Sequence, residues 1–146
     1  MTGPIIEDLD LDACTARLAA HDIARIALVD DGWPVVFPVN YRLVDLDRHR
    51  WIALRTRPGG VVDRPGARVA LQLDGIDRTH REGWCVLVRG TLHEVDETAA
   101  GFRERFDPRP WLDDRDAWLV IEPAMITGRR VVGRELDWAF AVEAYL

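Results

Sequence analysis

A β-hairpin signature between residues 23 and 43 constrains the fold of this chain more than any other part of the sequence. Two apolar runs, residues 23–29 and 33–43, flank the turn sequence Asp30-Asp31-Gly32. Aspartate followed by glycine supplies the positive φ angles that tight hairpin turns need. The second run alternates, which predicts one core face and one face that carries polar groups. The core face would hold Val35, Phe37, Val39 and Tyr41, and the other face Val36, Pro38 and Asn40.

The rest of the chain predicts an α+β fold that is mainly β. Connections of hairpin length predominate over crossover helices, which indicates an antiparallel barrel or a strongly curled sheet of about six strands. Helices are expected at residues 11–20, after the cap Asp10, and at 97–106, with a single helical turn at 61–64. The other strands are expected at 51–56, 68–74, 84–95, 117–121 and 126–132, with a polar loop over 75–82 and a break around Pro123.

Size and charge narrow the class of protein. A chain of 146 residues with 48% apolar and 30% charged residues fits one globular domain, 1–146. It has no apolar run near the roughly 20 residues that cross a bilayer, and residues 1–7 lack a signal-peptide pattern, so we expect a cytoplasmic protein without a membrane partner. A net charge of −6 argues against binding to nucleic acid.

Cysteine and histidine spacing offers no metal or disulfide site. Cys14 and Cys85 lie far apart without a CxxC motif, so we expect both to be small buried apolar residues. The motifs of acyl transfer, nucleotide hydrolysis and Rossmann cofactor binding are missing as well. Four histidines lack metal-ligand spacing, and a structural or exposed role is expected for His21, His49, His80 and His93.

Three segments stand out together: FPVNY at 37–41, LRTRPGG at 54–60 and GWCVLVRG at 83–90. Their order and spacing resemble the pyridoxamine 5'-phosphate oxidase-like family of split-barrel flavoproteins, in particular its branch of small proteins related to nitroimidazole resistance proteins. The likeness continues into WLVIEP at 118–123 and TGRR at 127–130, so it covers about 11–132 and leaves 133–146 as a C-terminal extension.

The resemblance implies a six-stranded antiparallel split barrel with two or three short helices. It also implies a homodimer with two cofactor sites at the subunit interface, each holding flavin mononucleotide (FMN) or, alternatively, a deazaflavin. The implied cofactor-binding residues are Pro38, Val39, Asn40, Tyr41, Arg55, Thr56, Gly59, Gly60, Trp84 and Cys85.

These residue types suit a flavin. Its phosphate is a dianion, which a guanidinium fork, a hydroxyl and backbone N–H groups bind well, and Arg55, Thr56 and the turn Gly59-Gly60 offer all three. The ring needs an apolar wall and a few hydrogen bonds, for which Asn40 and Trp84 are candidates. The alternatives are a solvated strand charge for Arg55, a surface amide for Asn40 and a core aromatic for Trp84.

One position departs from the family pattern. The family's phosphate loop usually carries a lysine shortly after the glycine, and here that position is Val61. Losing one charged phosphate contact costs roughly 1.5 to 3 kcal/mol. Candidates to replace it are Arg57, Arg64 and Arg68.

The leading functional hypothesis is an oxidoreductase that passes a hydride between FMN or a deazaflavin and a small organic substrate. The cofactor performs that chemistry, so no catalytic acid or base is assigned. The alternatives are a non-catalytic flavin- or ligand-binding dimer, and a haem-binding barrel with His21, His49 or His93 as axial ligand. The apolar tail, with Trp138 and Phe140, is expected to fold over the cofactor cleft or to extend the dimer contact.

Overall fold

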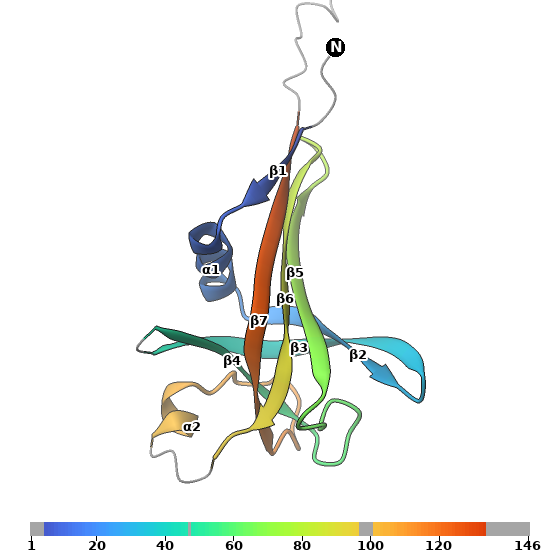
Figure 1. Cartoon of the computed structure of the whole chain (residues 1–146), viewed down its shortest axis with the longest axis vertical. Helices are drawn as coiled ribbons and strands as arrows, with labels where there is room; N and C mark the ends of the chain where they lie inside the picture. The colour runs from blue at the N-terminus through green and yellow to red at the C-terminus, as the bar shows by residue number, and fades with distance from the viewer. Residues whose placement is uncertain (1–4, 47, 97–100, 134–146) are drawn as a thin grey trace, which may run out of the picture.

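The computed structural model describes residues 5–46, 48–96 and 101–133. Six antiparallel strands form a ring in the order β7-β4-β3-β2-β5-β6, which the pairing of β6 with β7 closes, and β1 pairs with the far end of β7 (Figure 1). This confirms the split barrel expected from the sequence. The elements are β1 (Ile5–Leu9), α1 (Leu11–Ala20), β2 (Ile23–Asp30), β3 (Trp33–Leu46), β4 (His49–Thr56), β5 (Arg68–Asp77), β6 (Glu82–Glu94), α2 (Phe102–Arg105) and β7 (Ala117–Val132).

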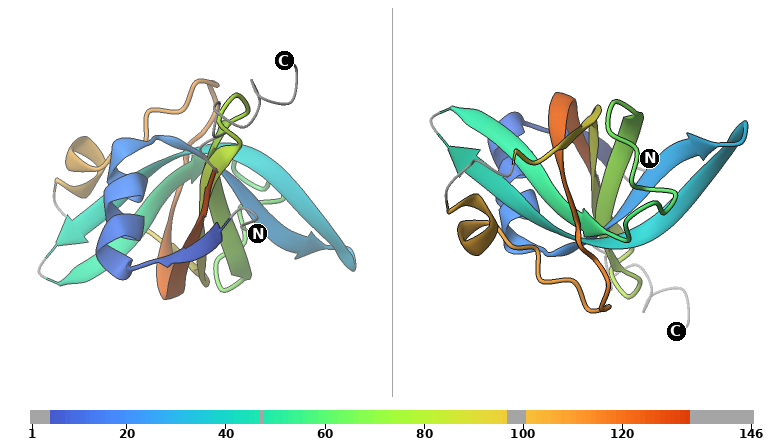
Figure 2. Two further views of the ribbon diagram at one scale, coloured as in Figure 1. Left: turned by 90° about the horizontal axis from the view of Figure 1, so that it is seen from above. Right: turned by 90° about the horizontal axis from the view of Figure 1, so that it is seen from below.

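The hairpin of β2 and β3 forms as its sequence predicts. Asp31 and Gly32 have φ angles of 50° and 78°, the pair of positive values that a two-residue hairpin turn requires. Along β3 the predicted alternation holds, because Val35, Phe37 and Val39 pack against the core while Val36 and Pro38 are exposed. The hairpin tip projects from the side of the barrel (Figure 2).

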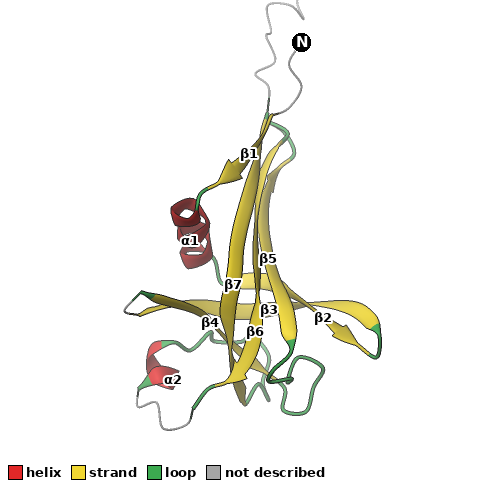
Figure 3. Cartoon of the chain, in the orientation of Figure 1, coloured by secondary structure: helices red, strands yellow, loops and turns green. Residues whose placement is uncertain are grey.

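Helix α1 lies against the barrel beside β7, and Figure 3 shows both helices outside the ring of strands. The Asp10 carboxylate caps its first turn by accepting a 2.8 Å hydrogen bond from the Ala13 N–H. Cys14 and Leu18 point into the main core and are fully buried. The core therefore joins the helix to the barrel strands, with Ile26, Leu54 and Leu71 among its members.

Strand β7 runs unbroken through Pro123, so the predicted break there is wrong. Pro123 sits opposite Gly90 at a register shift in the β6–β7 pair, where Arg89 pairs with Met125. Ala124 is thus the extra residue of a bulge, and a bulge accommodates a residue that has no N–H.

Other boundaries also differ from the prediction. Strand β1 was not predicted, and the expected loop over 75–82 is shorter, since β5 extends to Asp77 and β6 begins at Glu82. Residues 61–64 lie in hydrogen-bonded turns and not in a helix. Of the helix expected at 97–106, the structure describes Phe102–Arg105. Residues 134–146, with Trp138 and Phe140, lie outside the described residues.

The two cysteines are both free thiols. Cys14 is buried, as expected, whereas Cys85 is only half-buried. Burial, assisted by the nearby Asp10 carboxylate, raises the pKa of the Cys14 thiol. None of the described helices has the length and apolarity needed to cross a membrane.

Tyr41 gives the fold a pH dependence that can be measured. Its hydroxyl is buried and donates a 2.7 Å hydrogen bond to the Leu18 carbonyl oxygen, and burial raises the pKa of this phenol well above its ordinary value of 10.0. Above about pH 10 the unfolded chain releases a proton that the folded chain holds, so the free energy of unfolding falls as pH rises.

Urea titrations between pH 8 and pH 11 check this expectation. We expect Tyr41→Phe to lower the free energy of unfolding by about 1 kcal/mol at pH 8, because the Leu18 carbonyl oxygen loses its hydrogen-bond donor. Above pH 10 the free energy of unfolding of the variant is expected to fall less steeply than that of the original protein. Parallel curves for the two proteins would show that another group carries the alkaline loss of stability.

Candidate cofactor site

A cavity of about 290 Å³ opens where β4 ends. Strand β4 stops at Thr56, and the loop of residues 57–62 then forms a second wall opposite β3. Residues 110, 112 and 115, from the segment before β7, complete the lining. The cavity brings together six of the residues that the sequence assigns to the cofactor: Pro38, Val39, Asn40, Arg55, Thr56 and Gly60.

Arg55 lies in this cavity with its guanidinium already bonded. Its Nε donates a 2.9 Å hydrogen bond to the Arg115 carbonyl oxygen, and one terminal nitrogen lies 3.2 Å from an Asp107 carboxylate oxygen. The guanidinium also stacks on the Trp118 ring, 4.8 Å from its centroid. With its side chain 22% exposed, Arg55 is a positioned cation and not a freely solvated strand charge.

The glycine loop has the turn geometry that its sequence suggests, but its amides are used internally. Gly59 has a φ of 72°, and its N–H donates to the Asp63 carboxylate at 2.9 Å. The Gly60 N–H donates to the Arg57 carbonyl oxygen, also at 2.9 Å. In this conformation neither of these two amides is free to bind an anion.

One of the three arginines considered as replacements for the family's lysine lies at the cavity. Arg57 lines it and is exposed to solvent. Arg64 instead binds Asp30 and the Val29 carbonyl oxygen at the hairpin turn. Arg68 borders a separate apolar hollow over β2 and β5. Val61 remains an apolar part of the cavity wall.

Asn40 connects β3 to the segment before β7. Its side-chain oxygen accepts a 3.1 Å hydrogen bond from the Trp111 N–H, and its amide nitrogen is a further donor. Pro38, two residues earlier, is exposed and cannot donate a backbone hydrogen bond. This part of β3 thus offers the cavity a polar amide beside an apolar surface.

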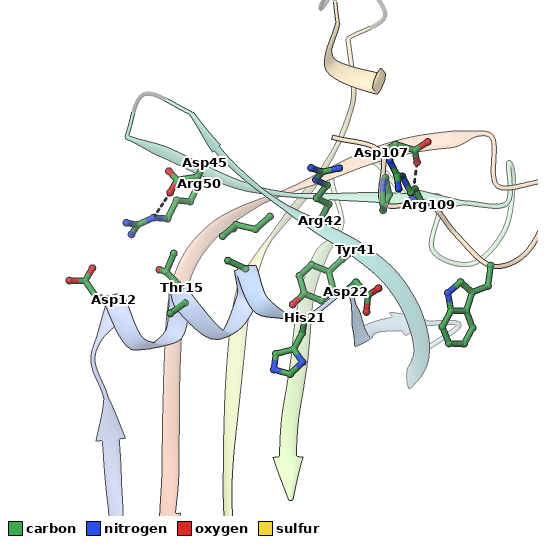
Figure 4. A pocket seen from close by; sticks show the side chains of 15 residues that line it. Asp12, Thr15, His21, Asp22, Tyr41, Arg42, Asp45, Arg50, Asp107 and Arg109 are labelled. Carbon is green, nitrogen blue, oxygen red and sulfur yellow. Dashed lines mark hydrogen bonds and ion pairs between the residues drawn. The ribbon is translucent and has the colours of Figure 1, made fainter. Parts of the chain in front are cut away.

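Tyr41 packs in the main core on the other side of β3, at the base of a larger open groove beside α1 (Figure 4). The groove has a volume of about 920 Å³ and mixed charge. Arg50 pairs with its cross-strand neighbour Asp45 at 3.9 Å, and the other charged lining residues are Asp12, Asp22, Arg42, Asp107 and Arg109. Because the Tyr41 hydroxyl is bonded to Leu18, this residue supports the helix and does not line the cavity of Arg55.

Trp84 and Cys85 lie on β6, away from the cavity. The Trp84 ring packs between Arg17, whose guanidinium carbon is 4.5 Å from the ring centroid, and His21, at 5.1 Å between centroids. Glycine at position 75 leaves room for the indole, since a Cβ there would lie 2.4 Å from Trp84 Nε1. Within one chain neither residue lines the cavity of Arg55, and their assignment to the cofactor stays a prediction.

A family model described as Pyridoxamine 5'-phosphate oxidase matches residues 10–130. The chain belongs to this family. The match covers both walls of the cavity, β3 with Asn40 and β4 with Arg55.

Several individual proteins are similar to this chain. An uncharacterised protein of Mycobacterium tuberculosis, Rv0080, is 30% identical over 131 residues, which cover 87% of this chain and 86% of that protein. The FAD binding protein from Mycobacterium smegmatis superposes with a TM-score of 0.65 at 25% identity, covering 86% of this chain and 98% of that one. A 5-nitroimidazole antibiotic resistance protein from Bacteroides thetaiotaomicron shares the fold, with a TM-score of 0.67 at 14% identity over 92% of this chain and 93% of that one.

Sequence reasoning on the family motifs missed the segment of residues 107–116. It supplies Asp107 to Arg55, the Trp111 amide to Asn40, and Leu112 to the cavity wall. Trp111 is 78% exposed, an unusual position for so large an apolar side chain. The signal was present in the sequence as a tryptophan in a loop that also contains Pro108 and Pro110.

The histidines contact different neighbours. His93 Nε2 lies 2.9 Å from a Glu122 carboxylate oxygen, His49 borders a shallow hollow near Trp51, and His21 packs on Trp84. No cluster of three or more metal-ligating side chains occurs in the part of the chain that the structure describes.

Proposed function

We propose that this chain binds a flavin phosphate in the cavity of Arg55 and acts, as a homodimer, as an oxidoreductase. When bound, FMN or a deazaflavin would exchange a hydride with a small organic substrate, and the protein would hold and orient it. The observation that carries this proposal is the meeting of Arg55, Thr56 and Asn40 at one cavity.

The phosphate is expected at the end of β4. A phosphate dianion there would face the Arg55 guanidinium and the Thr56 hydroxyl, with Arg57 able to approach from the loop. Among the residues that the structure describes, Arg57 makes no ion pair, so its charge is available for a ligand. The FAD binding protein of M. smegmatis, at 25% identity, supports a flavin as the ligand.

The ring is expected to extend beyond the cavity. At about 290 Å³ the cavity lies at the lower end of the range for small-molecule sites, so it would hold the phosphate end while the isoalloxazine rests on the outer surface of β3. That surface is apolar, with Val36 59% exposed and Pro38 beside it. A flat aromatic ring suits such a surface because it buries apolar area on one side.

A second copy of the chain is the expected cover for this surface. Large apolar side chains are exposed along the β2–β3 hairpin, and exposed apolar patches commonly mark interfaces. A two-fold dimer buries the same patch on both subunits and needs no other partner. The exposed residues are Ile23, Val29, Trp33 and Val36.

A non-catalytic ligand-binding dimer is the second candidate. It is favoured by the carboxylate of Asp107, which already neutralises Arg55, and by Val61 in place of the family's lysine. Both features lower the affinity for a phosphate and leave the fold intact.

Native mass spectrometry of freshly purified protein, with a visible spectrum, tests the proposal. We expect a dimer that carries one flavin per chain, either as purified or after incubation with FMN, and a yellow colour that bleaches on reduction. A dimer that holds a colourless ligand would favour the second candidate, and a Soret band would identify a haem protein. A monomer that takes up no flavin would refute the proposal.

A further inference from the structure

The segment of residues 107–116, here called the strap, makes hydrogen bonds with two polar side chains of the cavity, Arg55 and Asn40. It runs from α2 to the start of β7 (Figure 2). Its Asp107 carboxylate oxygens lie 3.2 and 3.4 Å from an Arg55 terminal nitrogen, and its Arg115 carbonyl accepts from Arg55 Nε at 2.9 Å. Its Trp111 N–H donates to Asn40 at 3.1 Å. The strap therefore binds two groups that a flavin would also use.

The strap is also the wall between the two hollows. Pro110 and Leu112 line the cavity of Arg55, whereas Arg109 and Trp111 line the groove beside α1. Figure 4 shows Asp107 and Arg109 at the edge of that groove. A movement of the strap would thus change the walls of both hollows.

The backbone of the strap is strained in this position. Arg109 and Asp114 have φ angles of 50° and 58°, in the left-handed region that disfavours residues with a Cβ. The Arg109 N–H donates to Asp107 at 2.8 Å, so the carboxylate that holds Arg55 also holds this turn. Such a conformation persists only while its contacts hold it, and Asp107 makes two of them.

The charge on the ligand decides whether it displaces Asp107. The pair is only partly solvated, with the Arg55 side chain 22% exposed and that of Asp107 31% exposed. A neutral ligand gains nothing from replacing the carboxylate. A phosphate dianion carries more charge than a carboxylate and binds a guanidinium through two parallel hydrogen bonds, so it competes for the same nitrogens.

We propose that Asp107 sets the affinity and selectivity of the cavity for phosphate-bearing ligands, because its carboxylate occupies Arg55 until a phosphate displaces it and releases the strap. This inference rests on the proposed function. In this role Asp107 opposes ligand binding, because it competes with the ligand for the Arg55 guanidinium and does not contact the ligand itself.

Titration of the full-length protein with FMN and with riboflavin tests this role, because the two ligands share a ring and differ by the phosphate. Asp107→Asn removes the charge and keeps the size of the side chain. We expect the Kd for FMN to fall about three- to tenfold, as expected for a partly buried ion pair, and the Kd for riboflavin to stay within twofold. The effect on FMN is expected to vanish when Arg55→Ala is combined with Asp107→Asn.

Asp113→Asn is the matched control. Asp113 lies in the same strap, and among the described residues it makes no ion pair with Arg55, so both Kd values are expected to stay within twofold of the original protein. Hydrogen exchange gives a second readout. Amide exchange over 107–116 is expected to rise when FMN binds, and to rise without any ligand in Asp107→Asn but not in Asp113→Asn.

The outcomes separate the two proposals. If FMN binds the original protein and Asp107→Asn equally, or binds the variant more weakly, the role of Asp107 is wrong and flavin binding stands. Unchanged exchange over 107–116 in Asp107→Asn would also overturn it. If neither protein binds FMN, the proposed function itself fails, and this inference falls with it.

Discussion

Replacing Arg55 with alanine is expected to weaken FMN binding by about ten- to a hundredfold. The guanidinium is the most buried cation at the cavity and would form charge-assisted hydrogen bonds to the phosphate, each worth roughly 1.5 to 3 kcal/mol. Flavin fluorescence quenching on titration of the apoprotein measures the change. Arg55→Lys is expected to recover part of the loss, because it restores the charge without the planar fork.

Arg64→Ala is the control for this experiment. Arg64 lies eight residues after the end of β4, but its guanidinium binds Asp30 and the Val29 carbonyl oxygen. We expect its Kd for FMN to stay within twofold. Thermal unfolding of each apoprotein is measured alongside, since Arg55→Ala also removes the contacts to Asp107 and Arg115. Equal Kd values for Arg55→Ala and Arg64→Ala would remove Arg55 from the site.

Gly90→Ala is expected to cost the fold about 3 kcal/mol or more, out of a total stability of about 5 to 15 kcal/mol. A Cβ at position 90 would lie 2.3 Å from the Glu122 carbonyl oxygen and 2.8 Å from Ile121 Cγ2. The first contact is with backbone of the paired strand, so β6 and β7 must separate at the bulge to make room. The free energy of unfolding in urea gives the change directly.

Gly83→Ala provides the comparison on the same strand. A Cβ there would meet the Gly75 carbonyl oxygen at 3.1 Å, which a shift of a few tenths of an ångström relieves. We expect Gly83→Ala to lower the free energy of unfolding by less than about 1 kcal/mol. If the two variants were equally stable, the bulge at Gly90 would not be the tight approach that the structure shows.

The sequence was most informative where local chemistry decides the structure. The turn at Asp31 and Gly32 depends on two positive φ angles, and the faces of β3 follow from strict alternation, so both were predicted correctly. Asn40 and Arg55, which the family motifs assign to the cofactor, line one cavity, and their role in binding it stays a prediction. In these cases a few neighbouring residues contain all the information that is needed.

Prediction failed where pairing with distant strands decides the structure. Pro123 indicates a break by itself, yet Gly90 opposite allows a bulge that keeps β7 continuous. Strand β1 is short and exposed, and it becomes a strand through its pairing with Gly128 to Val132 of β7. The contact between Asp107 and Arg55 joins residues 52 positions apart, which no local pattern reveals.

The position of Trp84 within one chain also depends on contacts with residues that are distant in the sequence. Its sequence context, after a glycine at the start of a strand, was compatible with a cover for the flavin ring. In the structure its ring is held by Arg17 and His21 beside α1. Because Arg17 and His21 lie far from Trp84 in the sequence, the place of the indole within one chain depends on the arrangement of the whole barrel, and its contact with a cofactor stays a prediction.

A crystal structure of the protein with FMN tests the central claim most directly. We expect the phosphate within hydrogen-bond distance of the Arg55 guanidinium and the Thr56 hydroxyl, with the ring on the outer surface of β3. A flavin bound instead in the groove beside α1, with Arg55 still paired to Asp107, would contradict it.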